Sequence, residues 1–249
     1  MLQSIENFLK RTLQKLLGFE NYLYIFSIFT YNRLKIGLIE EEFLYFIKLV
    51  PREGTILDIG ANIGVMSTMM AKKFPQSKIV SFEPITENIK VFKRVKNHYS
   101  LSNVTLNEVA VGDSTGTIQM VMPEEANVRL HGLSKVASAE DKGATYDVPL
   151  IKIDDVPQLN EPGVKITAIK IDVENYEVFA LKGAEKLLRK HMPVIYCELW
   201  DNQNRVNVIG LLSGMGYLPK VFDNGTLVDF ANQKVMNFIF LPPGTKLPS

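Results

Sequence analysis

The stretch "ILDIGANIGV", Ile56 to Val65, decides the fold, because an apolar strand runs there into a tight glycine turn. The turn consists of Gly60, Ala61, Asn62, Ile63 and Gly64, and small residues of this kind let a main chain approach a ligand closely. A segment of helical period follows, whose first N–H groups are free to meet a ligand. A strand, a glycine turn and a helix in this order are typical of the ligand-binding end of a doubly wound α/β sheet.

The rest of the chain continues this alternation from Thr55 onward. Short apolar runs rich in β-branched residues predict strands, and longer segments of helical period between most of them predict helices. Strands that are apolar on both faces belong in a parallel sheet covered on both sides. We therefore expect a doubly wound, Rossmann-like α/β fold with strands at 55–59, 78–83, 104–111, 166–172 and 193–199, and helices near 65–74, 85–99, 176–191 and 204–214.

Both ends of the chain depart from this rhythm, and so does one internal segment. Two strand-like runs around Asn224-Gly225 predict a hairpin, and residues 235–241 add one more strand, which implies an antiparallel C-terminal edge. We expect an irregular insertion at about 114–155, with strand-like runs at 117–122 and 148–154 on either side of a polar loop. An N-terminal helical extension at 1–50 precedes a catalytic domain at 51–249. Residues 2–17 have the pattern of an amphipathic helix, which packs on its own domain, on a second copy in a homodimer, or on a membrane surface.

Charge and composition exclude several classes of protein. The net charge is +1, so nothing indicates a nucleic-acid partner. The single cysteine, Cys197, cannot form an internal disulfide, and no run of apolar residues reaches the roughly 20 that a membrane span needs. The N-terminus lacks the pattern of a secretory signal. We expect a cytoplasmic protein without a transmembrane segment.

The glycine turn and the next strand predict an adenosine-containing cofactor. Glu83 ends the second strand, where its carboxylate can accept hydrogen bonds from ribose hydroxyls. A dinucleotide fits poorly, because Asn62 stands where pyrophosphate needs a glycine and Asp58 adds negative charge nearby. S-adenosylmethionine has no phosphate and carries two positive groups. It is therefore the cofactor that suits this turn.

Five segments resemble, in order, the motifs of the FkbM family of S-adenosylmethionine-dependent methyltransferases. They are "ILDIGANIGV", "SFEP" (81–84), "VAVGD" (109–113), "VPLIKIDD" (148–155) and "IKIDVENYEVFALKGAEKLL" (169–188), within a likeness over roughly residues 40 to 241. The resemblance implies a class I methyltransferase fold and O-methylation of a sugar, glycan, glycolipid or secondary metabolite. It adds Pro84, Val109 and Ala110 to the expected cofactor site. One departure is Asn175, which replaces a glycine of the family's D-x-E-G-x-E motif and puts the shape of that loop in question.

Carboxylates at the ends of the fourth and fifth strands are the candidates for catalysis. Asp172 and Glu174 end one strand, Glu177 follows, and Glu198 ends the neighbouring strand. An acid closing an apolar central strand is costly without a partner, which favours Asp172 and Glu198 as catalytic residues. They would act as a general base with its partner, or as ligands of a divalent cation such as Mg²⁺. We expect Glu177 to stabilise the start of the next helix instead.

The insertion and the loop after the fifth strand supply candidates for the acceptor site. His131 lies in the polar insertion and has a side chain of suitable pKa for a base. Arg129, Ser134, Glu174 and Trp200 are candidate substrate contacts, although a solvated loop or the end of a sheet explains such residues equally well. Two alternative functions stay open at this point: an NAD-dependent oxidoreductase and a non-catalytic protein with a methyltransferase-like fold.

Overall fold

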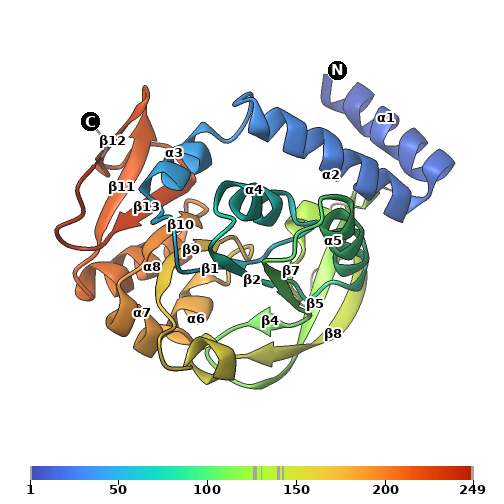
Figure 1. The fold of residues 1–249 in the computed structure, drawn as a ribbon. Helices are drawn as coiled ribbons and strands as arrows, with labels where there is room; N and C mark the ends of the chain where they lie inside the picture. The colour runs from blue at the N-terminus through green and yellow to red at the C-terminus, as the bar shows by residue number, and fades with distance from the viewer. Residues whose placement is uncertain (1, 126–127, 130, 139–140, 142, 248–249) are drawn as a thin grey trace.

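The structure is a computed structural model that describes residues 2–125, 128–129, 131–138, 141 and 143–247; the side chains of residues 2–9, 125, 128, 129 and 131 lie outside the description. A large mixed sheet forms its centre, with helices on both faces (Figure 1). The strands follow the order β12-β11-β13-β10-β9-β1-β2-β3. Their bounds are β1 Thr55–Ile59, β2 Lys78–Phe82, β3 Val104–Asn107, β9 Ile166–Ile171, β10 Val194–Glu198, β11 Leu218–Asp223, β12 Thr226–Asp229 and β13 Asn237–Leu241.

The sheet confirms the doubly wound fold and its antiparallel edge. Strands β3, β2, β1, β9 and β10 pair in parallel, whereas β13, β11 and β12 pair antiparallel. The hairpin of β11 and β12 turns at Asn224-Gly225, as predicted, and both residues have positive φ. The winding direction reverses between β1 and β9, so the carboxyl ends of these two strands border the crevice where ligands bind in such folds.

Two apolar cores cover the two faces of the sheet. One contains Leu57, Ile169 and Cys197 with the helices after β9 and β10; the other contains Ile56, Ala168 and Tyr196 with helices from the first half of the chain. The alternation along each strand accounts for this division, since neighbouring residues face opposite sides. The helices are α1 Leu2–Leu17, α2 Phe19–Lys35, α3 Glu41–Leu49, α4 Val65–Lys73, α5 Thr86–His98, α6 Glu177–Lys182, α7 Glu185–His191 and α8 Gln203–Gly214.

The N-terminal helices lie along one side of the sheet, and α2 crosses α4 and α5 (Figure 1). Leu23 and Tyr31 on its inner face are buried, while Ile25 and Phe29 on its outer face are exposed. The predicted amphipathic helix is present as α1, which contacts α2. No helix in the described part of the chain is long and apolar enough to cross a membrane. The boundary at residue 50 stays a prediction.

The insertion forms a second sheet, which contains the two strand-like runs that we predicted and adds short strands from the segment predicted as a polar loop. Strands β4, β8, β5 and β6 follow one another in this sheet, and β7 pairs with β5. The long partners β5 and β8 bury Met120, Met122 and Val148, which gives the insertion an apolar core of its own. Its elements are β4 Ala110–Val111, β5 Gly116–Glu125, β6 Val128–Arg129, β7 Lys135–Val136, β8 Gly143–Ile151 and the short 3₁₀ segments His131–Leu133, Ile153–Asp155 and Pro157–Leu159.

Two predicted elements are divided in the structure. The strand expected at 104–111 splits into β3, which joins the large sheet, and β4, which pairs with β8 of the second sheet. The helix expected at 176–191 breaks at Gly183, where an added Cβ would lie 1.8 Å from the carbonyl oxygen of Gly112. Asp154 accepts hydrogen bonds from the N–H groups of Lys186 and Leu187, so a new helix begins there.

Candidate active site

The glycine turn after β1 is held tightly between its neighbouring strands. The N–H groups of Gly60 and Ala61 both donate to the carbonyl oxygen of Phe82 at 3.0 Å. Gly60 has φ 77°, and a Cβ there would lie 1.8 Å from the carbonyl oxygen of Asp172. Only glycine fits this position, because both the conformation and the space exclude a side chain. The turn therefore presents bare backbone at the switch point of the sheet.

Glu83 stands beside this turn as a buried carboxylate, 4% exposed. Its Oε2 accepts a hydrogen bond from the Asn62 N–H at 2.8 Å, and its Oε1 accepts from the Ile85 N–H and from Asn88 Nδ2. Burial raises the pKa of Glu83, while these hydrogen bonds act in the opposite direction. The donors fix the orientation of the carboxylate, and Oε2, with one donor, keeps room for another. Glu83 is thus suited to accept a hydrogen bond from a ligand hydroxyl.

A cleft with about 620 Å³ of empty space, part of it open to solvent, connects Glu83 with the end of β9. One half is apolar and is lined from the second sheet; the other half carries the polar groups of the turn and of the loop after β9. The cofactor cleft, as we call it, is lined by Ile59, Gly60, Asn62, Phe82, Glu83, Pro84, Ile85, Asn88, Val109, Ala110, Val111, Ile118, Met120, Gly132, Ser134, Val136, Asp172, Val173, Glu174 and Tyr176.

Two polar atoms at this cleft fit a ligand such as adenosine. Oδ1 of Asn88 and Oδ1 of Asn62 are buried, and neither has a hydrogen-bond partner among the described residues. Asn88 also donates to Glu83, so a diol could bind to the pair. An unpartnered buried oxygen is costly, and a bound hydroxyl or amino group would remove this cost. An apolar wall for the base and acceptors for the ribose are what S-adenosylmethionine requires.

A buried lysine ties the turn to the large sheet from below. Lys170 pairs with Asp58 across β1 and β9, and its Nζ donates to the carbonyl oxygen of Gly60 at 2.7 Å. The same Nζ lies 3.5 Å from carboxylate oxygens of Asp58 and Asp172. Burial alone would lower the pKa of Lys170, but these two carboxylates raise it to about 12. Asp58 also accepts a hydrogen bond from Ser67, so its carboxylate stabilises the turn and lines no cleft.

Three carboxylates gather where β9 and β10 end. Burial and the nearby charge of Asp172 raise the pKa of Glu174 to about 8 and that of Glu198 to about 7. Asp172 itself is half-buried and lies against Lys170. Protonation of Glu174 and Glu198 therefore changes near neutral pH, which is the range in which a general acid or base works best.

Glu177 and Asn175 shape the loop between these acids. Oε1 of Glu177 accepts hydrogen bonds from the N–H groups of Val173 and Asn175, which agrees with the structural role predicted for it. Asn175 has φ 71°, and asparagine tolerates this left-handed conformation far better than most residues. Its Oδ1 accepts a hydrogen bond from Asn202 at 2.6 Å. The loop thus has a glycine-like backbone without the glycine of the D-x-E-G-x-E motif.

Most of the predicted cofactor residues meet in the cofactor cleft, and three do not. Gly60, Asn62, Glu83, Pro84, Val109 and Ala110 line it. Asp58 lies beneath the turn, Ala61 lines a second cavity, and Gly64 begins α4 with its backbone against the ring of Phe92. A direct contact of these three with the cofactor stays a prediction that the geometry does not support.

The candidate catalytic and substrate residues are more dispersed. Asp172, Glu174 and Ser134 line the cofactor cleft, whereas Glu198 and Trp200 line neither cavity. Trp200 is 39% exposed at the end of β10. The side chains of Arg129 and His131 lie outside the described residues, so their roles stay predictions. Ser134 lines the cofactor cleft, and its role as a substrate contact stays a prediction.

The candidate site contains several residues that we did not predict from the sequence. Asn88 donates a hydrogen bond to Glu83, and Ile118, Met120 and Tyr176 line the cofactor cleft. Lys170 could have been found, because a lysine inside the apolar strand "ITAIKI" requires a buried partner. Nothing in the sequence indicates that the insertion folds against the glycine turn. The insertion residues that line the cofactor cleft therefore could not be predicted.

A metal site was the alternative use of Asp172 and Glu198. Within the ranges that the structure describes, no group of three or more His, Cys, Asp or Glu side chains is placed to hold a metal ion. The ammonium of Lys170 already lies against Asp172. These carboxylates therefore have a cationic partner from the chain itself, and no observation supports a metal at this position.

Comparison with known proteins agrees with this geometry. Residues 58–230 match the model of the methyltransferase FkbM domain. Methyltransferase sdnD of Sordaria araneosa is 29% identical over 199 residues, which cover 70% of this chain and 77% of that protein. Methyltransferase 1 of Beauveria bassiana is 25% identical over 173 residues, 61% of this chain and 69% of that one.

A similar fold is found among solved structures. The methyltransferase FkbM from Methylobacillus flagellatus KT has a TM-score of 0.52 and 18% identity. The likeness covers 76% of this chain and 44% of that one, so the chain spans less than half the length of that protein. At this identity the likeness concerns the fold alone, which is the Rossmann-like fold of class I methyltransferases.

Proposed function

Because the chain belongs to the FkbM methyltransferase family, we propose that it transfers the methyl group of S-adenosylmethionine to a hydroxyl oxygen. The acceptor classes that we consider are a sugar, a glycan, a glycolipid or a secondary metabolite. One observation carries the proposal: a single cleft joins the buried Glu83 to Asp172, with a bare glycine turn between them. Glu83, which would bind the cofactor, and Asp172, the candidate base, would therefore contact the same ligand.

Different residues of the cofactor cleft would bind different parts of the cofactor. Glu83 and Asn88 would accept hydrogen bonds from the ribose hydroxyls, and the apolar wall with Val109, Ala110 and Met120 would hold the adenine ring. Carboxylates near the turn suit a ligand with positive groups. S-adenosylmethionine supplies an electrophilic methyl group on a positive sulfonium when it is bound.

Asp172 is the residue that we assign as the base. It lines both cavities of this region, whereas Glu198 lines neither. A carboxylate oxygen of Asp172 would accept the hydroxyl proton of the acceptor, while the bound cofactor would supply the methyl group and keep the electron pair of the carbon–sulfur bond. Burial, the charge of Asp172 and the charge of Glu198 together raise the pKa of Glu174, so Glu198 acts as a positioning residue. His131 is the alternative base.

The test is methyl transfer from labelled cofactor to a panel of glycans, lipids and small hydroxyl compounds. We expect Asp172→Asn to lower the rate by about 100-fold or more, while binding of S-adenosylhomocysteine is retained. Glu198→Gln should retain activity and change its pH profile, and the exposed Glu161→Gln is the matched control. Nearly full activity of Asp172→Asn would contradict the assignment. Binding without transfer to any acceptor would favour the non-catalytic alternative.

We also propose where the protein works and what it contacts. The only cysteine, Cys197, is buried, as suits a protein of the cytoplasm. Exposed apolar and basic side chains share α1 and α2, which supports a contact with an anionic membrane surface over a homodimer. The exposed residues are Arg11, Lys15, Leu16, Ile25, Phe29, Arg33, Lys35 and Ile36.

A further inference from the structure

A second cavity lies on the other side of the glycine turn, between that turn and helix α2. Its empty space is about 610 Å³, including the part open to solvent. We call it the α2 cavity. It is lined by Phe26, Thr30, Leu34, Ile39, Glu40, Ala61, Asn62, Ile63, Val65, Met66, Lys170 and Asp172.

The α2 cavity adjoins the cofactor cleft at the residues that matter most for methyl transfer. Asn62 and Asp172 line both spaces. A molecule in the α2 cavity can therefore reach the proposed base from the side opposite the ribose-binding Glu83. An in-line displacement needs the acceptor oxygen on one side of the methyl group and sulfur on the other. Two spaces that share the base satisfy this requirement.

The walls of the α2 cavity are mainly apolar. Phe26 and Leu34 come from α2, Ile63 from the turn, and Val65 and Met66 from α4. Thr30 contributes a hydroxyl. An amino-acid group, with a carboxylate and an ammonium, would find few partners along such walls. These walls therefore suit an occupant whose surface is mostly carbon.

Carboxylates predominate on the floor of the α2 cavity. Glu40 and Asp172 line it, and Lys170 is the cation beside them. Lys170 already contacts Asp58, Asp172 and the carbonyl oxygen of Gly60, so its charge is compensated. The hydroxyl of Tyr196 donates a hydrogen bond to Oε2 of Glu40 at 3.5 Å. An acceptor that carried a phosphate or carboxylate at this end would meet like charges at short range.

From these features we propose that the α2 cavity binds the methyl acceptor, and that the acceptor is an uncharged hydroxyl compound with an apolar body. The inference rests on the proposed function and narrows it, since free sugars and anionic acceptors are excluded. The hydroxyl lies against Asp172, and the apolar body packs on Phe26, Leu34 and Met66. Helix α2 is then the element that selects the acceptor.

The experiment measures binding of two probes to protein saturated with S-adenosylhomocysteine, by isothermal titration calorimetry. The probes are 4-hexylphenol, which is neutral at pH 7.5, and 4-hexylbenzoate, which has the same body and a negative charge. We expect the phenol to bind at least about tenfold more tightly than the benzoate, because like charges cost binding energy. Equal binding of the two probes would overturn the inference.

Variants on the cavity wall connect this binding to the α2 cavity. Thr30→Trp on α2 and Met66→Trp on α4 should each weaken phenol binding at least about tenfold by filling the space. Each should leave the affinity for S-adenosylhomocysteine unchanged. Asn32→Trp, at an exposed position of the same helix, is the matched control and should bind the phenol as the unmodified protein does.

The outcomes separate this inference from the proposed function. If the unmodified protein does not bind S-adenosylhomocysteine, the proposed function itself is wrong. If it binds this compound but not the phenol, or if the filled variants bind the phenol normally, only the acceptor site is wrong. A parallel loss of both ligands in Thr30→Trp and Met66→Trp would mean that the α2 cavity holds part of the cofactor, which also overturns the inference.

Discussion

Lys170 decides how the acids of the site are arranged. Its ammonium lies among Asp58, Asp172 and the carbonyl oxygen of Gly60 in the interior of the protein. A buried cation in contact with two carboxylates fixes the positions of both. Glu174 and Glu198 lie further along the same edge of the sheet. Burial and the charge of Asp172 raise their pKa values, so their protons are held up to near neutral pH.

Glu174 makes the stability of the protein depend on pH. Its pKa rises from 4.5 to about 8 on folding, so the folded state binds a proton that the unfolded state has lost over this range. The contribution to stability is fully present below the unfolded value and is lost as the pH rises through about 8. The free energy of unfolding, measured in urea, should fall more between about pH 5 and pH 8.5 for the unmodified protein than for Glu174→Gln.

The control for this prediction is Glu161→Gln, which replaces an exposed glutamate. It should follow the unmodified protein at every pH. Glu198 contributes in the same direction in all three proteins. If Glu174→Gln and the unmodified protein lost the same free energy of unfolding over this range, the assignment of the proton to Glu174 would be wrong.

At the residue scale, the sequence predicted which residues line the cofactor cleft better than it predicted the arrangement of the acids. Glu83 and Gly60 follow from the spacing of a strand, a turn and a second strand, and this spacing is local. The partners of Asp58 depend on the register of β1 and β9, which join residues more than a hundred positions apart. The position of Asp58 beneath the turn and its pairing with Lys170 therefore could not be predicted from the sequence.

At the element scale, the loop after β9 depends on a left-handed backbone at Glu174 and Asn175. Their φ angles are 51° and 71°. Asparagine can adopt this conformation because its short side chain forms local hydrogen bonds, here with Asn202. The loop places Glu174 in the lining of the cofactor cleft, and the N–H groups of Val173 and Asn175 donate hydrogen bonds to Glu177. Changes at Asn175 therefore affect both the loop and the site.

Replacement of Asn175 by glycine and by alanine separates the backbone from the side chain. Both variants lose the hydrogen bond with Asn202, but only glycine is free of strain at positive φ. We expect Asn175→Ala to be less stable than Asn175→Gly by about 1 kcal/mol in urea unfolding. Equal stability of the two variants, or a more stable alanine variant, would show that the loop has another conformation.

The order of strands and helices was predictable, whereas the folding of the insertion was not. Alternating apolar runs and helical periods gave the parallel sheet, and Asn224-Gly225 gave the hairpin. Residues 114–155 have weaker patterns, and their strands are stabilised by pairing between β5 and β8 across a long polar segment. Tertiary contacts of this kind leave little signal in a single sequence.

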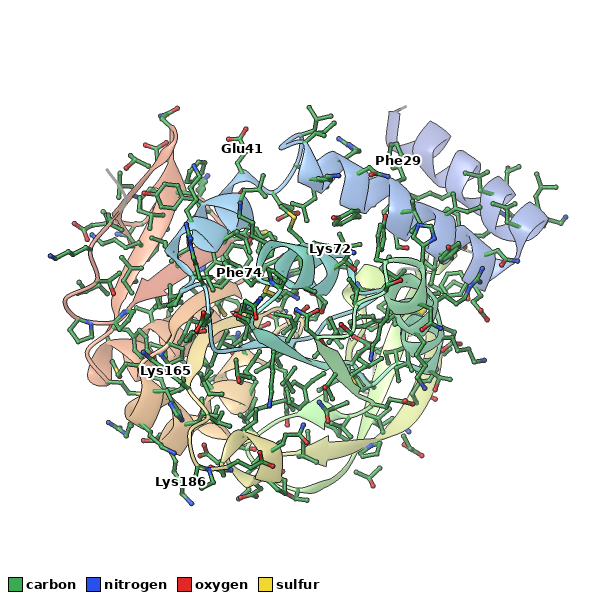
Figure 2. All side chains as sticks on the ribbon, in the orientation of Figure 1. Phe29, Glu41, Lys72, Phe74, Lys165 and Lys186 are labelled. Atoms are coloured by element: carbon green, nitrogen blue, oxygen red, sulfur yellow. The ribbon has the colours of Figure 1, made fainter. Side chains whose placement is uncertain are left out.

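At the scale of the whole molecule, the outer side of α1 and α2 carries exposed apolar side chains. Phe29, labelled in Figure 2, is 58% exposed, and Leu16 is 76% exposed. The inner side of α2 packs on α4 and α5, which agrees with one of the roles expected for the N-terminal helices. Basic residues lie next to the exposed apolar ones, and this combination favours an anionic lipid surface.

Sedimentation with vesicles tests this surface. The protein should sediment with vesicles of phosphatidylcholine containing phosphatidylserine, and less with phosphatidylcholine alone, because Lys and Arg gain energy near anionic lipid. The double variant Ile25→Ser with Phe29→Ser should lose at least about half of this binding. No sedimentation, together with a dimer in light scattering that the double variant abolishes, would assign the surface to a second copy of the chain.

The whole account depends on a cofactor held by the carboxylate of Glu83 beside the glycine turn. The most direct measurement is the affinity for S-adenosylhomocysteine in isothermal titration calorimetry, with Glu83→Gln compared with Glu161→Gln. The account predicts binding by the unmodified protein and the control, and a loss of about tenfold or more in Glu83→Gln, since an amide cannot replace the carboxylate toward several donors. Equal affinity of all three proteins, with Glu83→Gln folded by circular dichroism, would contradict it.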